Sequence, residues 1–160
     1  MALKKPLVIN SSTGFPEQLQ TGDYINASNI PQYTNGEGSA SLAIGMPVYI
    51  SAADTVKRAQ ANASGTTFVI GLCNDPVITH GSTGGIAIEG VVTATTTQWD
   101  AVVTSESGGL TPGSNYFLDP ANVGALTTTP PSTVGQYVCL VGQAISTTEM
   151  KINIGQPILL

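Results

Sequence analysis

The stretch EMKINI, residues 149–154, decides the class of fold that this sequence predicts. Its apolar residues Met150, Ile152 and Ile154 alternate with polar ones, so they would share one face of an extended chain. A period of two is the signature of a half-buried β-strand. The stretch GIAIEGVV, residues 85–92, shows the same alternation. These two segments therefore predict β-structure with one face on a core.

Other short apolar runs lie between these segments and upstream of them. Each is rich in β-branched or aromatic residues, and clusters of Gly, Pro, Asn and Ser separate the runs. Strong helix formers are sparse, whereas Thr, Val, Ile, Gly and Pro dominate. We therefore predict an all-β fold, and a compact β-barrel and a sandwich both remain open. The further runs are PVYI (47–50), TTFVIGLC (66–73), YFL (116–118) and YVCLV (137–141).

Residues 51–60 are the best helix candidate, because Ser51 is a good N-cap and alanines follow it. We interpret them instead as a strand, a turn at Ala53 and Asp54, and a second strand. This interpretation fits a repeat, which suggests two pseudo-repeated halves that pair into one barrel. Chance similarity between β segments is the alternative. The repeat matches GMPVY (45–49), FVIG (68–71) and IAI (86–88) with PGSNY (112–116), LVG (140–142) and KINI (151–154).

The first quarter of the chain differs from the rest. Residues 11–40 are rich in Ser, Asn, Gln, Gly and Pro and offer few apolar anchors. Such a composition does not build its own core. We predict an extended N-terminal arm over residues 1–40 and a β-barrel domain over residues 41–160.

The low charge of the chain excludes several classes of protein. Charged residues make up 9% of the 160 residues, against about 25% in a typical domain. Five Lys and Arg residues and a net charge of −5 argue against binding to nucleic acid. No apolar run is long enough for a membrane span. Lys4 and Lys5 precede only three apolar residues, too few for a signal peptide, so we expect synthesis in a cytoplasm.

Residues that could carry catalytic or metal chemistry are few and scattered. His80 is the only histidine and stands before a GSTGG loop, so we expect an exposed loop residue. Cys73 and Cys139 lie in apolar runs and are expected to be buried thiols, with a disulfide as the alternative. The ten acidic residues form no calcium-loop pattern. We therefore predict no catalytic residue, no cofactor, no metal ion and no enzymatic activity.

Trp99 is the one tryptophan, and it follows the polar residues 95–98, which we expect to form a strand. Two interpretations remain open for it. An exposed indole would face a ligand such as a glycan, or anchor an interface. A buried one would belong to the core or to the end of the barrel.

Several segments resemble structural proteins of tailed-bacteriophage virions. MALKKPLVIN (1–10) and QLQTGD (18–23) are similar to the N-terminal segment of phage fibre and decoration proteins. The middle of the chain, from GMPVYI (45–50) to GLC (71–73), is similar to small capsid cement proteins with a compact β-barrel. Further phage-like segments are GLTPGSNYFLDP (109–120), GALTTTPP (124–131), VGQA (141–144) and QPILL (156–160).

The resemblance implies a capsid decoration, or cement, protein on the capsid surface of a virion, commonly a homotrimer bound to the major capsid protein. A head-fibre or tail-associated module that binds a host glycan receptor is the alternative, with Trp99 as the ligand-facing residue. The arm would add a strand to a neighbour's sheet. Residues expected to contact the capsid or a neighbour are Leu3, Pro6, Leu7, Val8 and Ile9. Residues expected at the oligomer contact are Ile158, Leu159 and Leu160.

Overall fold

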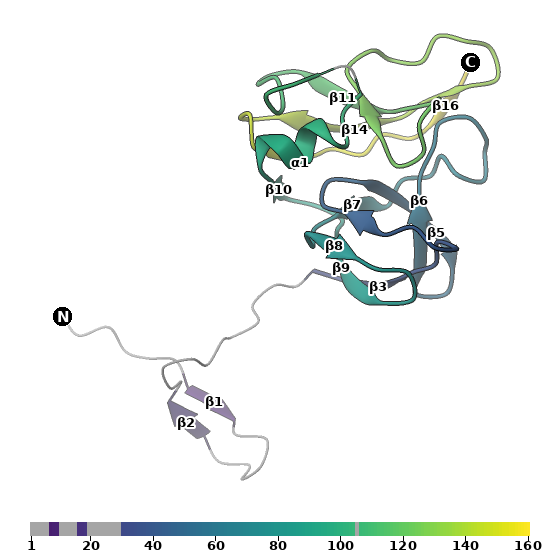
Figure 1. Ribbon diagram of the computed structural model, residues 1–160. Coiled ribbons are helices and arrows are strands. Elements are labelled where there is room, and N and C mark those ends of the chain that lie inside the picture. The colour runs from purple at the N-terminus through teal and green to yellow at the C-terminus, as the bar shows by residue number, and fades with distance from the viewer. Residues whose placement is uncertain (1–6, 10–15, 19–29, 105) are drawn as a thin grey trace.

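The computed structural model describes residues 7–9, 16–18, 30–104 and 106–160. The described part of the chain is nearly all β, with 38% of residues in strands and 4% in helix, which confirms the predicted fold class. Figure 1 shows two β units stacked on one another, the lower one built from the earlier part of the chain. The first unit alone is a closed barrel, so a barrel is present as predicted. The expectation that the two halves pair into one barrel is wrong, because the strands of the second half form a separate sheet.

Most strands are short, and glycine-rich turns connect many of them. The N-terminal pair is β1 (Leu7–Ile9) and β2 (Pro16–Gln18). The first unit contains β3 (Gln32–Asn35), β4 (Leu42–Ala43), β5 (Pro47–Ala52), β6 (Thr55–Arg58), β7 (Gly71–Cys73), β8 (Val77–Ile78) and β9 (Thr83–Ala87). The second contains β10 (Val91–Thr93), α1 (Thr96–Asp100), β11 (Asn115–Leu118), β12 (Leu126–Thr127), β13 (Tyr137–Val138), β14 (Leu140–Ala144), β15 (Glu149–Ile152) and β16 (Ile158–Leu159).

The first unit closes in the order β3-β6-β5-β7-β9. Strand β3 runs parallel to β6 and antiparallel to β9, and this double pairing closes the barrel. Strands β5 and β6 form a hairpin whose turn contains Ala53 and Asp54. Asp54 has a φ of 49°, in the left-handed region that Asp tolerates better than most residues. The predicted strand, turn and strand over residues 51–60 are confirmed.

The second unit repeats this topology. Its sheet order is β10-β15-β14-β11-β12, and a parallel bridge joins Val103 to Leu126 of β12. Strands β11, β12, β14 and β15 pair with one another as β5, β6, β7 and β9 do. The Val103 bridge takes the place of the parallel contact between β3 and β6. The two halves predicted from sequence therefore share one strand arrangement.

Corresponding turns confirm the repeat and correct its alignment. Gly45 and Gly113 have φ angles of 84° and 83°. The N–H of Gly45 donates to Cys73 O over 2.8 Å, and that of Gly113 donates to Ala144 O over 2.9 Å. Gly45 thus matches Gly113, and not Pro112 as the sequence repeat predicts. The sequence repeat matches Tyr49 with Tyr116, whereas the turn requires a glycine with a positive φ at the same place in each half.

The structure corrects the strand predicted at residues 95–98, which are the start of helix α1. Thr95 is its N-cap: the side-chain oxygen accepts from Gln98 N over 3.2 Å. The Gln98 side chain accepts in return from Thr95 N over 2.8 Å. This reciprocal capping box satisfies two donors that a helix start leaves unpaired. The Thr-x-x-Gln spacing was the sequence signal for this helix.

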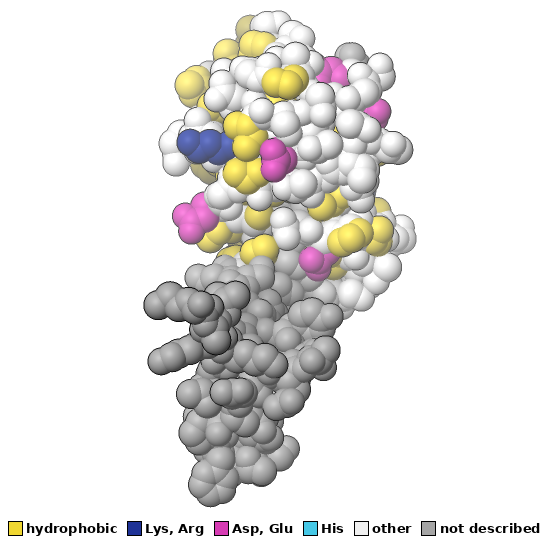
Figure 2. Space-filling view, turned by 90° about the vertical axis from the view of Figure 1, so that its left-hand side faces the viewer, with side chains coloured by type: hydrophobic (Ala, Val, Ile, Leu, Met, Phe, Trp, Pro, Cys, Tyr) yellow, Lys and Arg dark blue, Asp and Glu magenta, His cyan; other side chains and the backbone are white. Residues whose placement is uncertain are grey.

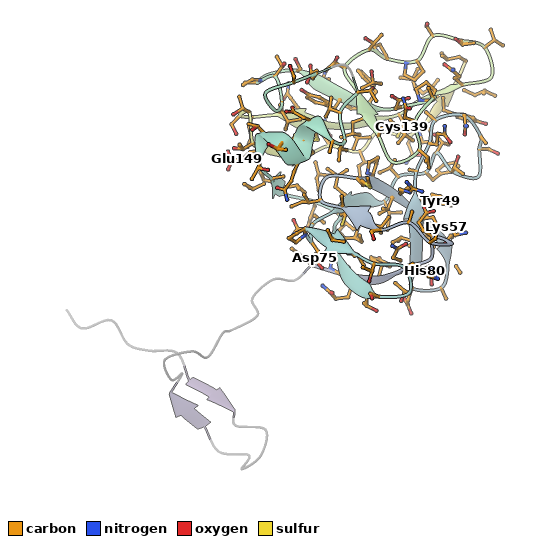
Figure 3. All side chains as sticks on the ribbon, in the orientation of Figure 1. Tyr49, Lys57, Asp75, His80, Cys139 and Glu149 are labelled. Atoms are coloured by element: carbon orange, nitrogen blue, oxygen red, sulfur yellow. The ribbon has the colours of Figure 1, made fainter. Side chains whose placement is uncertain are left out.

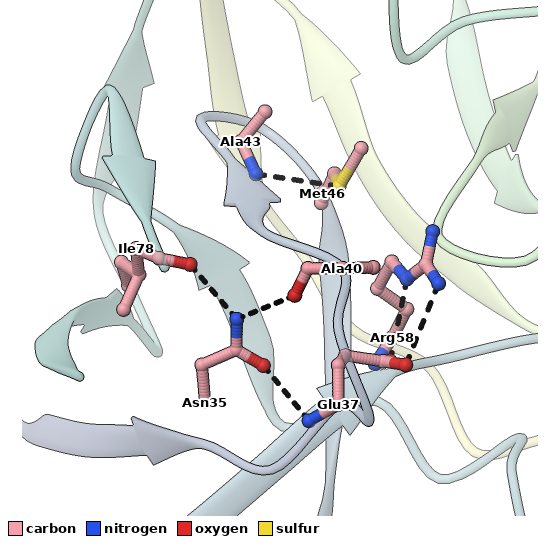
Figure 4. Close-up of polar contacts among 7 residues, drawn as sticks. All are labelled: Asn35, Glu37, Ala40, Ala43, Met46, Arg58 and Ile78. Atoms are coloured by element: carbon pink, nitrogen blue, oxygen red, sulfur yellow. Dashed lines mark hydrogen bonds and ion pairs between the residues drawn. The ribbon is translucent and has the colours of Figure 1, made fainter. Parts of the chain in front are cut away.

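The structure also corrects the boundary between arm and barrel, because residues 32–35 form the barrel strand β3 and are not part of the arm. Asn35 is fully buried in this strand. Its side-chain nitrogen donates to Ala40 O (2.9 Å) and Ile78 O (2.8 Å), and its oxygen accepts from Glu37 N (2.9 Å), as Figure 4 shows. The polar residues of β3 predicted an arm. A buried amide such as that of Asn35 is nevertheless stable in a core when its nitrogen and oxygen are both hydrogen-bonded.

An ion pair fastens the segment after β3 to the barrel. Glu37 Oε1 accepts from Arg58 N over 2.8 Å and lies 3.3 Å from Arg58 Nε (Figure 4). Burial alone raises the pKa of Glu37, but the hydrogen bonds and charge of Arg58 outweigh it and lower that pKa. The carboxylate is therefore ionised at neutral pH and holds Glu37 against Arg58 of β6.

The two units share a continuous core. Ala61 N donates to Asp119 O over 3.1 Å, and Gly124 N donates to Ala59 O over 2.7 Å, so the chain after β6 crosses into the second unit. A separate cluster inside the first barrel consists of Leu42, Val48, Val56, Cys73, Ile78 and Ile86. The cluster that spans both units includes Leu72, Ala87, Trp99, Tyr116, Val141 and Met150. Residues 30–160 therefore pack as one body.

Asp119 sits at this crossing and is only 4% exposed. One carboxylate oxygen accepts from the backbone N–H groups of Ala121 (2.6 Å) and Asn122 (2.9 Å). The other accepts from the Thr104 hydroxyl (2.8 Å) and the Asn122 side chain (3.3 Å). Burial raises the pKa of Asp119, but these hydrogen bonds favour the ionised form and hold the pKa below its ordinary value.

We expect Asp119→Asn to lower the free energy of unfolding at pH 7 by about 1–3 kcal/mol, because the amide nitrogen cannot accept these bonds. A lowered folded-state pKa stabilises the fold above about pH 4, and this contribution is lost as the pH falls through the folded pKa. The difference between the variant and the wild type should therefore shrink below about pH 4. Urea unfolding across a pH series measures it, and an unchanged difference down to pH 2 would contradict the assignment.

Candidate interaction surface

Three segments that lie against one another carry no charged side chain. Residues 59–70, 126–140 and 152–160 contain no Asp, Glu, Lys, Arg or His. We call these three segments the uncharged end. In Figure 1 the terminus marked C and β16 lie at this end of the second unit. Such a stretch of surface is unusual, because monomeric proteins keep charges spread over their surfaces.

Hydrogen bonds join the three segments. Tyr137 N donates to Ala61 O over 3.0 Å, which links the second segment to the first. Gly155 N donates to Leu140 O over 2.9 Å, which links the third to the second. The buried thiol of Cys139 lies 3.6 Å from Gly155 O beneath them. The uncharged end is therefore one connected piece of structure.

Large apolar side chains are exposed at this end. It holds five of the eleven exposed large hydrophobic residues in the described chain. Apolar residues gathered on an uncharged surface mark interaction sites more often than scattered ones do. The five, with their exposed fractions, are Phe68 (57%), Val134 (88%), Ile158 (63%), Leu159 (59%) and Leu160 (39%).

Strand β16 presents an open edge at the same end. It pairs antiparallel with β13, with Tyr137 opposite Leu159, and no other described strand pairs with it. Leu160 N donates to Gln136 O, and Leu160 O accepts from Gly135 N, each over 3.0 Å. Both backbone groups of Leu160 thus face β13. Because these groups alternate along a strand, the N–H and C=O of Leu159 face the open edge.

The structure does not test the contacts predicted for the arm and tail. Leu3 and Pro6 lie outside the described residues. Residues 7–9 form β1, which pairs antiparallel with β2. Their contact with a capsid or a neighbour stays a prediction. The C-terminal residues form the expected last strand, β16, and their role in oligomer contacts also stays a prediction.

The structure contradicts the ligand-facing interpretation of Trp99, which is fully buried. Its Nε1 donates to Thr148 O over 3.0 Å, so the polar atom of the indole is already satisfied. A Cβ added at Gly45 would lie 2.6 Å from the ring, which shows how closely the first unit packs on it. Trp99 is the core aromatic of the second interpretation, and it cannot contact a glycan.

The other singled-out residues match their expected surroundings. His80 is exposed in the turn after β8, on the lower unit in Figure 3, while Cys139 lies in the upper unit. Cys73 and Cys139 are free and buried, so the disulfide alternative is wrong. Burial raises the pKa of Cys73 to about 12 and that of Cys139 to about 11. Both thiols therefore remain protonated at neutral pH and act as small apolar groups.

Within the described ranges, no group of three or more His, Cys, Asp or Glu residues is arranged to hold a metal ion. Over the same residues, no helix has the length and apolarity needed to cross a membrane. Figure 2 shows the left-hand side of the molecule as drawn in Figure 1, where isolated acidic and basic side chains lie among apolar and polar ones.

No protein-family model matches the chain, and a search of the curated proteins finds no match. Inference about function therefore rests on the residues themselves and on the surface just described.

The sequence predicted the C-terminal part of this surface but not the contributions of residues 59–70 and 126–140. It named Ile158, Leu159 and Leu160 from their apolar run at the end of the sequence. It did not name Phe68 or Val134, because neither residue's exposure follows from its neighbours. A usable signal was present, since residues 120–148 contain no charged side chain at all.

Proposed function

We propose that this protein is a non-enzymatic structural component of a tailed-phage virion that decorates and stabilises the capsid. It binds the major capsid protein through its N-terminal arm and binds other copies of itself, as a homotrimer in the arrangement that the sequence resemblance implies. It is made in the host cytoplasm and is finally located on the capsid surface. Nucleic acid and membrane are not among its proposed partners.

The observation that carries this proposal is the uncharged end, with five exposed large apolar side chains and an open strand edge. The cores of protein interfaces are depleted of charged residues in the same way. On a capsid lattice, many copies sum weak single contacts into strong binding. A surface of this kind suits a protein that works in an assembly.

The arm suits attachment by strand addition. Residues 7–9 are apolar and take part in strand pairing as β1. A strand joined to an exposed sheet edge gains main-chain hydrogen bonds, while its side chains supply specificity. We therefore keep Leu7, Val8 and Ile9, together with Leu3 and Pro6, as the proposed capsid contacts.

The alternative function, binding of a host glycan, required Trp99 to be exposed to a ligand. Trp99 is buried, and Tyr116 is buried as well. Its hydroxyl donates to Glu106, in a hydrogen bond of 2.6 Å. No other described feature favours a glycan site, so we propose the structural role alone.

Deletion of residues 1–12 tests the proposed attachment. We expect the truncated protein to keep its thermal unfolding midpoint and to lose binding to undecorated capsids, because the strand that joins the capsid is gone. Co-sedimentation with capsids measures binding, and calorimetry measures the midpoint.

A matched control changes an exposed apolar residue elsewhere. Val77 is 60% exposed on β8 of the first unit, and Val77→Asp should leave capsid binding intact. Full occupancy of capsids by the truncated protein would rule out the arm as the attachment site.

A further inference from the structure

We infer that the uncharged end binds a second copy of this chain, and that the open edge of β16 takes a strand from that copy. The inference rests on the proposed function, of which self-association is one part. It goes further by naming the whole surface, including Phe68 and Val134, and the backbone groups that form the contact.

The first argument is electrostatic. The chain carries a net charge of −5, so two copies repel when charged faces approach. The side chains of residues 59–70, 126–140 and 152–160 contribute nothing to that charge. Two copies meet with least repulsion through these residues. A strongly acidic or basic partner would find no opposite charge there, whereas a second uncharged end matches it.

The second argument is the amount of exposed apolar surface. Five large apolar side chains are exposed on the uncharged end, from 39% to 88% of each side chain. Exposed apolar residues gathered in one region often mark a functional contact. A stable interface buries about 800 Å² on each partner. The apolar side chains can therefore supply the interface core, and the surrounding Thr, Ser, Gln and Asn residues can supply its polar rim.

The third argument is the edge of β16 itself. Natural proteins protect exposed sheet edges with charges, bulges, prolines or covering segments. Pro157 precedes β16 and limits the edge to residues 158–160, but none of these three has a charged side chain. The outward N–H and C=O of Leu159 are a donor and an acceptor placed for a partner strand. An apolar edge that no charged side chain protects is consistent with one that a neighbour covers.

Two substitutions of Leu159 test the inference in pure protein without capsids. Leu159→Lys places a charge in the contact and blocks the edge. Leu159→Pro removes the outward N–H together with the leucine side chain and adds no charge; because that N–H makes no bond to β13, the fold should persist. We expect the wild type to sediment as a multiple of the 16.4 kDa chain and both variants to sediment as single chains.

Val77→Lys is the control, because Val77 is equally exposed on the opposite unit and should leave the oligomer unchanged. Circular dichroism must match the wild type for each variant. Oligomers that survive both Leu159 substitutions, or that Val77→Lys also dissolves, would overturn the inference. A monomeric wild type whose capsid binding is lost in Leu159→Lys would assign the surface to the capsid instead. Failure of capsid binding alone would count against the proposed function and not against this inference.

Discussion

Replacement of Trp99 by alanine will lower the free energy of unfolding by about 3–5 kcal/mol, the range for a large aromatic removed from a core. The indole is fully buried and belongs to the cluster that spans both units. Gly45 of the first unit packs against its ring, so the substitution opens a cavity between the units. Because domains are stable by only about 5–15 kcal/mol, this loss is a large fraction of the total.

Urea unfolding followed by circular dichroism measures the effect. Trp99→Phe is the matched control: it keeps most of the ring but loses the bond from Nε1 to Thr148 O. We expect it to cost clearly less than the alanine variant. A Trp99→Ala protein as stable as the wild type would show that the indole does not hold the two units together.

Alanine at Gly71 or Gly142 will destabilise the protein by about 1–3 kcal/mol each, the usual cost of overpacking. These glycines hold the same place in the two halves. A Cβ at Gly142 would lie 2.6 Å from the carbonyl oxygen of Lys151. A Cβ at Gly71 would meet the carbonyl oxygen of Ala87 in the same way. Backbone cannot move aside as the end of a side chain can, so the strands must separate.

Gly65→Ala is the control for both, since a Cβ there has no neighbour within 4 Å and the backbone needs no left-handed angle. Its effect should be small, because an open site adds no clash. Similar losses at Gly71 and Gly142, measured by thermal unfolding, would support the equivalence of the two halves. A neutral result at either position would contradict the close strand approach there.

Much of the fold was predictable because alternation and turn residues act locally. Met150 and Ile152 are buried on β15 as their spacing predicted, and the turn at Asp54 was expected. The elements that were predicted wrongly, β3 and α1, depend on more than the local pattern. The polar strand β3 is stable only because β6 and β9 flank it and Asn35 finds its partners far along the chain. Helix α1 carried a local signal, the capping box, that its β-branched threonines masked.

The candidate surface was predictable only where it coincides with an apolar run. Ile158 to Leu160 form such a run, so their strand followed from the sequence. Val134 is surrounded by Thr, Gly and Gln, and its 88% exposure depends on how the loop folds back toward β16. The absence of charge over three separate segments becomes a surface only when hydrogen bonds bring those segments together.

Hydrogen exchange at two neighbouring amides tests the self-association surface most directly. The N–H of Leu160 bonds to Gln136 and should be protected at every protein concentration. The N–H of Leu159 faces the open edge, so we predict protection at high concentration that disappears on dilution as copies separate. Rapid exchange of Leu159 at all concentrations, beside a protected Leu160, would show that no second copy covers β16.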